Sequence, residues 1–165
     1  MTVALTVTSG KATQMCISNT AACTAWTTSA ATKTWTLAAG DGDKTVYAFW
    51  KDAAGHVSAA PATATIKLDA TAPVGGTMSG AITGTSLALT WSGFSDALSG
   101  LASYKLVGGT TSPPAGCATG TVGYSGAGTS ATVTMTKGKT NYYRLCALDA
   151  AGNVTAGVLA TIKGI

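Results

Sequence analysis

Residues that could carry out chemistry are few in this chain. Its 165 residues include six acids, all of them Asp, a single His and no Glu. A serine-type catalytic triad would have to be built around His56 and a nearby acid such as Asp52. The sequence gathers no set of nucleophile, base and charge-stabilising groups of the kind that an active site needs. We therefore expect no enzyme activity and no cofactor.

A metal site has equally little support. Asp41 and Asp43, in the run GDGD, form the one weak calcium candidate. Calcium prefers about six to eight oxygen ligands, so two carboxylates would leave most of the shell to carbonyls and water. A polar hairpin turn is the simpler interpretation. The chain has no CxxC pair, and one His cannot complete a zinc site.

The most informative pattern is an internal repeat. Residues 46–67 read VYAFWKDAAGHVSAAPATATIK, and residues 143–163 read YRLCALDAAGNVTAGVLATIK. The run before each Asp alternates with period two, which predicts a half-buried strand. In each copy DAAG predicts a turn, in which Asp52 and Asp149 accept hydrogen bonds from nearby backbone amides. His56 follows the first turn, so we expect it to be an exposed turn residue.

Composition and the repeat together predict two small all-β domains. Charged residues make up 10% of the chain, against about 25% in an average globular protein. Without Glu, and rich in Thr and Gly, the chain is poor in helix signals. We expect one domain over residues 1–69, a linker over 70–73 that ends in a proline, and a second domain over 74–165.

The two domains differ at their beginnings. The segment between Pro73 and Leu87 has enough residues for an opening strand, whereas the first domain starts at what should be its second strand, Val3 to Thr8. A sandwich without its first strand has an unpaired backbone edge, here carrying Val3, Leu5 and Val7. Either the chain is part of a longer polypeptide, or another subunit adds the strand. We consider Val158 to Ile165 as the donor, although its ATIK segment is also needed as the last strand of its own domain.

Four cysteines, two per expected domain, favour an exported protein in an oxidising compartment. Of the three ways to pair them we expect Cys16–Cys23 and Cys117–Cys146, because each of these bonds stays within one domain. The sequence has no charged-then-apolar signal segment at its start and no apolar run of the roughly 20 residues that a membrane helix needs.

The charge pattern argues against nucleic-acid binding. The net charge is +4, and the ten basic residues are scattered along the chain, with one Arg, Arg144. A nucleic-acid surface would group basic and aromatic residues.

Aromatic residues allow two interpretations. Trp26, Trp35, Trp50 and Trp91 could form a sugar-binding platform, but alternation directs Trp50 and Trp91 into the sandwich interior. The same alternation places an apolar group on the outer face of the repeated strand, made of Tyr47, Phe49, Tyr142 and Leu148. Such a face indicates contact with a partner, or cover by a loop of the same domain.

The segments SDALSGLASYKLV, PPAGC and TNYYRLCALDAAGNVTAG resemble the fibronectin type III-like and immunoglobulin-like repeats of large bacterial exported and surface proteins. QMCISN, GDGDKTVYAFWKDAAGHVS and LDATAP resemble a sister repeat of the same proteins. The resemblance implies a sandwich of seven strands in two sheets, complete in the second domain and lacking its first strand in the first. Asn141 stands where such repeats usually have the tyrosine of the corner before strand F.

Two functional hypotheses follow. The first is a non-catalytic structural module of a bacterial extracellular filament, stalk or surface protein, self-associating by strand addition or packing on neighbouring domains. The alternative is a binding module with a glycan ligand, either an adhesin tip or a carbohydrate-binding accessory domain of a secreted enzyme. The sandwich itself does not choose between them, because it is a general-purpose fold.

Overall fold

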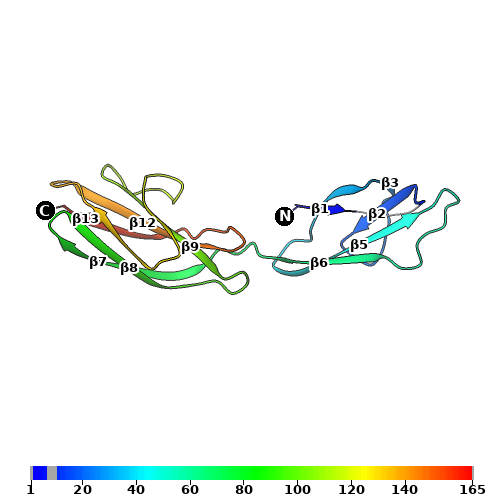
Figure 1. Cartoon of the computed structure of the whole chain (residues 1–165), viewed down its shortest axis with the longest axis horizontal. Coiled ribbons are helices and arrows are strands. Elements are labelled where there is room, and N and C mark those ends of the chain that lie inside the picture. Colours follow the sequence, from blue (N-terminus) through cyan, green and yellow to red (C-terminus); the bar gives the residue numbers. More distant parts are fainter. Residues whose placement is uncertain (1, 7–10, 165) are drawn as a thin grey trace. The chain divides into compact units, whose positions relative to one another are not determined.

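The protein is an all-β molecule, seen here in a computed structural model that describes residues 2–6 and 11–164 (Figure 1). Its strands form four antiparallel sheets. Among the described residues no helix is long and apolar enough to cross a membrane. The chain divides into two compact units, residues Met1–Asp69 and Ala70–Ile165, called unit 1 and unit 2 below.

Unit 2 is a two-layer sandwich of seven strands: β7 (Val74–Thr83), β8 (Ser86–Ser95), β9 (Leu101–Gly109), β10 (Thr121–Gly126), β11 (Ser130–Thr134), β12 (Thr140–Asp149) and β13 (Val158–Lys163). One sheet has the order β11-β8-β7 and the other the order β10-β9-β12-β13. The segment after Pro73 thus forms the opening strand that the sequence predicts.

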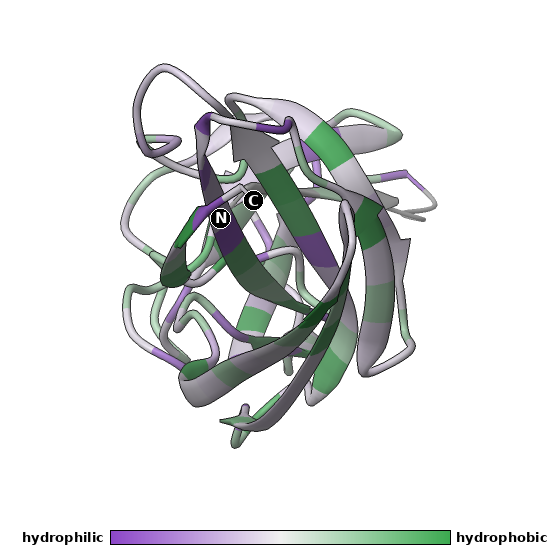
Figure 2. Cartoon of the chain, turned by 90° about the vertical axis from the view of Figure 1, so that its left-hand side faces the viewer, coloured by the Kyte–Doolittle hydropathy of each residue, from purple (hydrophilic) through white to green (hydrophobic). Residues whose placement is uncertain are grey.

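The core of unit 2 lies between these two sheets. Alternate residues of β8 and β12 face inward, so that Leu87, Leu89, Leu145 and Ala147 are at most 1% exposed. The alternation of apolar and polar residues along the strands is visible in Figure 2. Because a strand sends successive side chains to opposite faces, this pattern buries one face of each sheet and leaves the other outside.

The described residues of unit 1 form six strands: β1 (Thr2–Thr6), β2 (Gln14–Ser18), β3 (Thr27–Thr28), β4 (Thr32–Thr36), β5 (Gly42–Lys51) and β6 (Ala62–Leu68). The sheet β3-β2-β5-β6 has four strands, whereas β1 and β4 form a sheet of two. Among the described residues of unit 1, Ile17, Leu37 and Val46 form a buried apolar cluster, with Trp35, Ala48 and Ile66 packed against them.

A polar residue fixes the corner before the repeated strand in each unit. Asn141 is 3% exposed; its side chain accepts from the Thr136 amide and donates to the carbonyls of Thr136 and Lys139. Lys44 lies at the matching place in unit 1, where its Nζ donates to the carbonyls of Ala39 and Asp41. Asn141 thus holds this corner by hydrogen bonds from its side chain to the backbone, as a tyrosine does in immunoglobulin-type sandwiches.

We expect Asn141→Ala to lower the free energy of unfolding of unit 2 by about 1–3 kcal/mol, because buried groups of the corner lose their partners. The matched change Lys44→Ala should cost unit 1 less than about 1 kcal/mol, since water can reach its exposed turn. Hydrogen exchange followed peptide by peptide would measure both units in the intact chain. Equal losses in the two variants would contradict this account.

Candidate functional sites

The first candidate site is the free edge of β1. β1 pairs with β4 from Thr2↔Thr36 to Thr6↔Thr32, and β8 pairs with β11 from Ser86↔Thr134 to Thr90↔Ser130. The runs TWTL and TVTM, which end β4 and β11, align without a gap. With that alignment the two registers coincide, so the five residues of β1 correspond to Ser86–Thr90 of β8.

In unit 2 the other edge of that segment is covered by β7. Residues Ser79 to Thr83 pair there with Thr90 to Ser86. No described strand takes this place in unit 1, where β1 is bonded to β4 alone. Of the predicted edge residues, Val3 and Leu5 lie in β1, and Val7 lies outside the described residues.

The donor considered from the sequence is wrong. Val158 to Lys163 forms β13, and its residues pair with Thr140 to Leu145 of β12 over their whole length. The segment with this period-two pattern is the last strand of a sheet in its own unit. It would have to leave that sheet in order to complete another unit.

The two DAAG turns are held by their aspartates, as expected. Asp52 Oδ1 accepts from the amides of Ala54 and His56, at 2.9 Å each. Asp149, 3% exposed, accepts from the amide of Asn153 at 2.8 Å and from its side-chain Nδ2 at 2.7 Å. His56 Nδ1 lies 3.0 Å from Asp52 Oδ2. In unit 2 the side-chain Nδ2 of Asn153 makes the corresponding contact with Asp149 Oδ2.

Electrostatics in these turns favour ionised carboxylates. Hydrogen bonds from the side chain and then the backbone of His56 hold the pKa of Asp52 below its usual value. Burial by itself would raise the pKa of Asp149, but hydrogen bonds from Asn153, Gly152 and Ala151 lower it overall. Because the pKa of each aspartate is lowered in the folded protein, its ionised carboxylate stabilises the turn at pH values above the usual aspartate pKa. This stabilisation is lost as the pH falls through the lowered pKa.

His56 and Asp52 do not form an enclosed catalytic dyad. Their side chains are 81% and 43% exposed, so water surrounds the pair. Because an asparagine makes the same contact in unit 2, the interaction is best explained as turn structure.

The GDGD calcium candidate also lacks geometric support. Asp41 and Asp43 are exposed, and the Lys44 ammonium group occupies the turn, bonded to the carbonyl oxygens of Ala39 and Asp41. A cation bound at these carbonyls would repel a second one.

The structure joins Cys16 to Cys23 and Cys117 to Cys146, the pairings that the sequence predicts. Two disulfides are consistent with an extracellular, oxidising environment. In unit 2 the bond holds the loop after β9 against the outer face of β12, where Val107, Cys117 and Cys146 form a small buried cluster.

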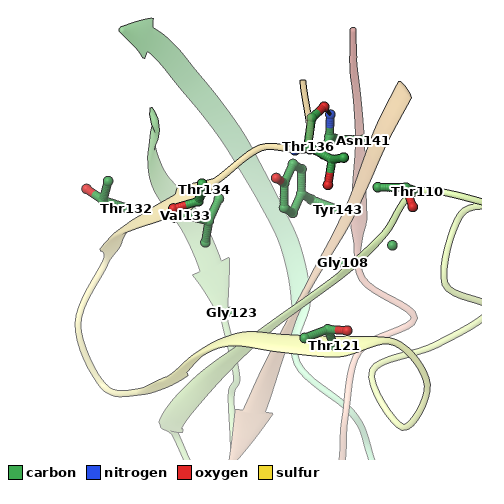
Figure 3. Close-up of a pocket in the computed structure, with 11 residues that line it drawn as sticks. Gly108, Thr110, Thr121, Gly123, Thr132, Val133, Thr134, Thr136, Asn141 and Tyr143 are labelled. Carbon is green, nitrogen blue, oxygen red and sulfur yellow. Dashed lines mark hydrogen bonds between the residues drawn. The ribbon is translucent and has the colours of Figure 1, made fainter. Parts of the chain in front are cut away.

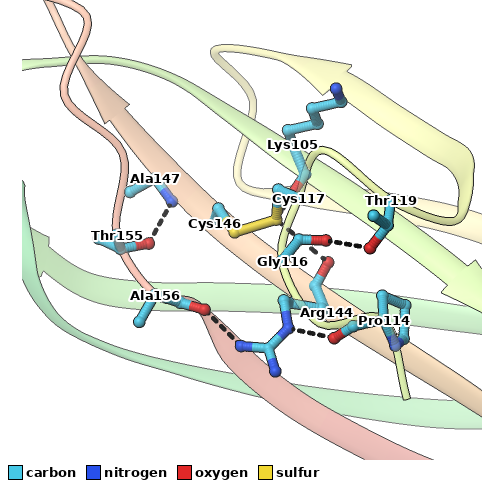
Figure 4. Close-up of a disulfide and its surroundings, with 10 residues drawn as sticks. All are labelled: Lys105, Pro114, Gly116, Cys117, Thr119, Arg144, Cys146, Ala147, Thr155 and Ala156. Carbon is cyan, nitrogen blue, oxygen red and sulfur yellow. Dashed lines mark hydrogen bonds between the residues drawn. A yellow bond between two sulfur atoms is a disulfide. The ribbon is translucent and has the colours of Figure 1, made fainter. Parts of the chain in front are cut away.

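Arg144 strengthens that attachment (Figure 4). Its Nε donates to the Pro114 carbonyl at 2.7 Å, in the disulfide loop, and its Nη1 donates to the Ala156 carbonyl, in the loop before β13. The disulfide and these contacts are called the clasp below. The unit's own loop therefore covers the part of the outer face around Cys146 and Val107. Tyr142 and Leu148 stay half-buried there, as Tyr47 and Phe49 do in unit 1.

Two of the four tryptophans, Trp91 and Trp35, belong to the apolar cores of their units. Trp91 is buried and makes edge contacts with Tyr104 and Tyr124, at 5.7 and 5.3 Å between ring centroids. Trp35 packs against the core of unit 1 and donates to Asn19 Oδ1 at 2.9 Å. Trp50 is half-buried, and one face of Trp26 is covered by Lys51 Nζ at 4.0 Å from the ring centroid.

A pocket of about 520 Å³ opens between the two sheets of unit 2 and was missed from the sequence (Figure 3). Its lining includes Gly108, Thr121, Gly123, Val133, Asn141 and Tyr143. Alternation predicts that Tyr143 faces inward, but no sequence signal shows that the space beside its ring is left unfilled.

Among solved structures, the chain is similar to one titled "Structures of Clostridium thermocellum CbhA fibronectin(III)-like modules". The two share 14% sequence identity with a TM-score of 0.57, over 99% of this chain and 84% of that one. This likeness supports the fibronectin type III-like fold. No family model matches the chain, and no curated protein sequence matches it.

Proposed function

We propose that the chain is a non-catalytic structural module of a bacterial extracellular filament, stalk or surface protein, in which a neighbouring subunit adds a strand to β1. The observation that carries the proposal is the equivalence of β1 with Ser86–Thr90 of β8, whose second edge is covered by β7. In unit 1 that edge is left unpaired by the described strands.

Physical reasons favour completion of this edge. Backbone groups along a free strand attract other strands, and natural proteins seldom leave such an edge open. β7 also contributes Met78 to the core of unit 2, so a strand added at the matching edge of unit 1 would bring further apolar side chains to its core. Strand addition from one subunit to the next is a head-to-tail contact, which builds a filament when its rotation does not close.

A self-complemented variant tests the proposal. Residues 74–85, which form β7 and the turn into β8, would be copied in front of Thr2 so that unit 1 carries its own strand. We expect the unmodified chain to form concentration-dependent oligomers or filaments, and the variant to stay monomeric. Sedimentation velocity and negative-stain micrographs would measure both.

The matched control carries a Gly-Ser segment of equal length at the same place, which cannot form the strand and should leave assembly intact. A monodisperse monomer for the unmodified chain would reject strand exchange and leave a spacer or stalk. Equal assembly of the chain and its self-complemented variant would show that subunits associate through another surface.

A further inference from the structure

The pocket of unit 2 lies where the two sheets are open to each other. β10 is the edge strand of one sheet and β11 that of the other. The pocket extends between them and is closed at its far side by β12 (Figure 3). Its volume of about 520 Å³ falls within the range of about 300–1,000 Å³ that is usual for small-molecule sites.

Tyr143 gives the pocket a hydroxyl group that has no protein partner among the described residues. Its side chain is 6% exposed, and its hydroxyl group points from β12 towards β11 (Figure 3). The hydroxyl oxygen makes no hydrogen bond with the described protein groups and is accessible from the pocket. An unused donor and acceptor inside a cavity is a group that a ligand can satisfy.

Glycines keep the pocket open. A Cβ on Gly108 would lie 3.0 Å from the Tyr143 ring, and a Cβ on Gly123 would lie 3.0 Å from Val133 Cγ1. Gly123 also falls at the irregularity where β10 shifts register against β9. Such bulges often occur beside functional sites, where they redirect the chain.

The chemistry of the lining selects the class of ligand. None of the lining residues is ionisable at neutral pH, which disfavours charged ligands. Thr110 and Thr121 place further hydroxyl groups at the pocket, with no protein hydrogen bond among the described residues. The Tyr143 ring and Val133 offer an apolar wall. Hydroxyl donors and acceptors beside an apolar wall match a ligand with several hydroxyl groups and an apolar C–H face.

We propose that this pocket binds a neutral sugar, with Tyr143 donating to a ring hydroxyl and Thr121 bonding another. The site is built within unit 2 and does not depend on the edge of β1. The proposal therefore stands or falls separately from the proposed strand addition.

Amide chemical shifts of the intact chain, titrated with neutral monosaccharides (glucose, galactose, mannose and N-acetylglucosamine) at millimolar concentrations, test the site. At least one sugar should shift the amides of Gly108, Gly123 and Tyr143. Tyr143→Phe, which keeps the ring and removes the hydroxyl, should weaken that binding roughly 2- to 12-fold, the factor that one hydrogen bond supplies. Thr121→Val should weaken it by a similar factor.

Tyr142→Phe is the matched control, because Tyr142 lies next in sequence on the opposite face of β12 and outside the pocket. It should leave affinity unchanged. Short oligosaccharides of the responding sugar distinguish two sources: tighter binding than the monosaccharide indicates a glycan chain, and equal binding indicates a free sugar. The proposal is rejected if no sugar shifts these amides, or if Tyr143→Phe and Tyr142→Phe bind equally well.

Discussion

Removing the Cys117–Cys146 disulfide by the double change to Ala should lower the free energy of unfolding of unit 2 by roughly 3–4 kcal/mol. The bond closes a loop with a sequence separation of 29, and the chain-entropy relation gives about 3.6 kcal/mol for a loop of that length. The Cys16–Cys23 bond has a separation of 7 and should contribute about 2.4 kcal/mol to unit 1 by the same relation.

Peptide-resolved hydrogen exchange in the intact chain would report each unit separately. The change in unit 2 has a second cause, since the loop that Cys117 anchors also covers Val107. Hydrogen exchange of the amides in the loop that carries Cys117 should therefore increase more than exchange of the amides in β7 and β8. A larger loss for the Cys16–Cys23 variant would contradict the entropic ordering.

Much of the architecture could be predicted because it depends on local patterns. Alternation in residues 143–147 predicts that Tyr143, Leu145 and Ala147 face inward, and all three are buried in the core of unit 2. The repeat of DAAG predicts the turns that Asp52 and Asp149 hold. The unpaired edge of β1 among the described strands could be inferred because one copy of the repeat has residues for an opening strand before it and the other does not.

Features that depend on packing between distant segments could not be predicted. The pocket lies between β10 and β11, where Gly108 leaves space beside Tyr143 and Gly123 leaves space beside Val133, and a two-residue period shows none of this. Alternation places Arg144 on the outer face of β12, but its carbonyl partners come from two loops whose paths the sequence leaves open. By its pattern, Val158 to Ile165 could be the last strand of its own domain or a donor strand, and the pairing of Val158–Lys163 with β12 shows the first of these roles.

The clasp also explains why Gly157 cannot carry a side chain. Gly157 has φ +85°, and a Cβ there would lie 2.8 Å from both Cys146 Sγ and the Leu145 carbonyl oxygen. Gly152 has φ +93°, but a Cβ on it would meet nothing within 4 Å. The two glycines therefore share the backbone conformation that disfavours other residues and differ in the space around them.

Gly152→Ala should cost unit 2 about 1–2 kcal/mol, the strain of a left-handed backbone at a residue with a side chain. Gly157→Ala should cost this amount and a further 1–3 kcal/mol or so, because the loop before β13 must move away from the disulfide and the backbone of β12. Urea unfolding monitored through amide exchange of unit 2 would measure both variants. Equal losses would show that backbone strain alone accounts for Gly157. The expected excess would show instead that close packing of this loop against Cys146 is part of what holds the clasp together.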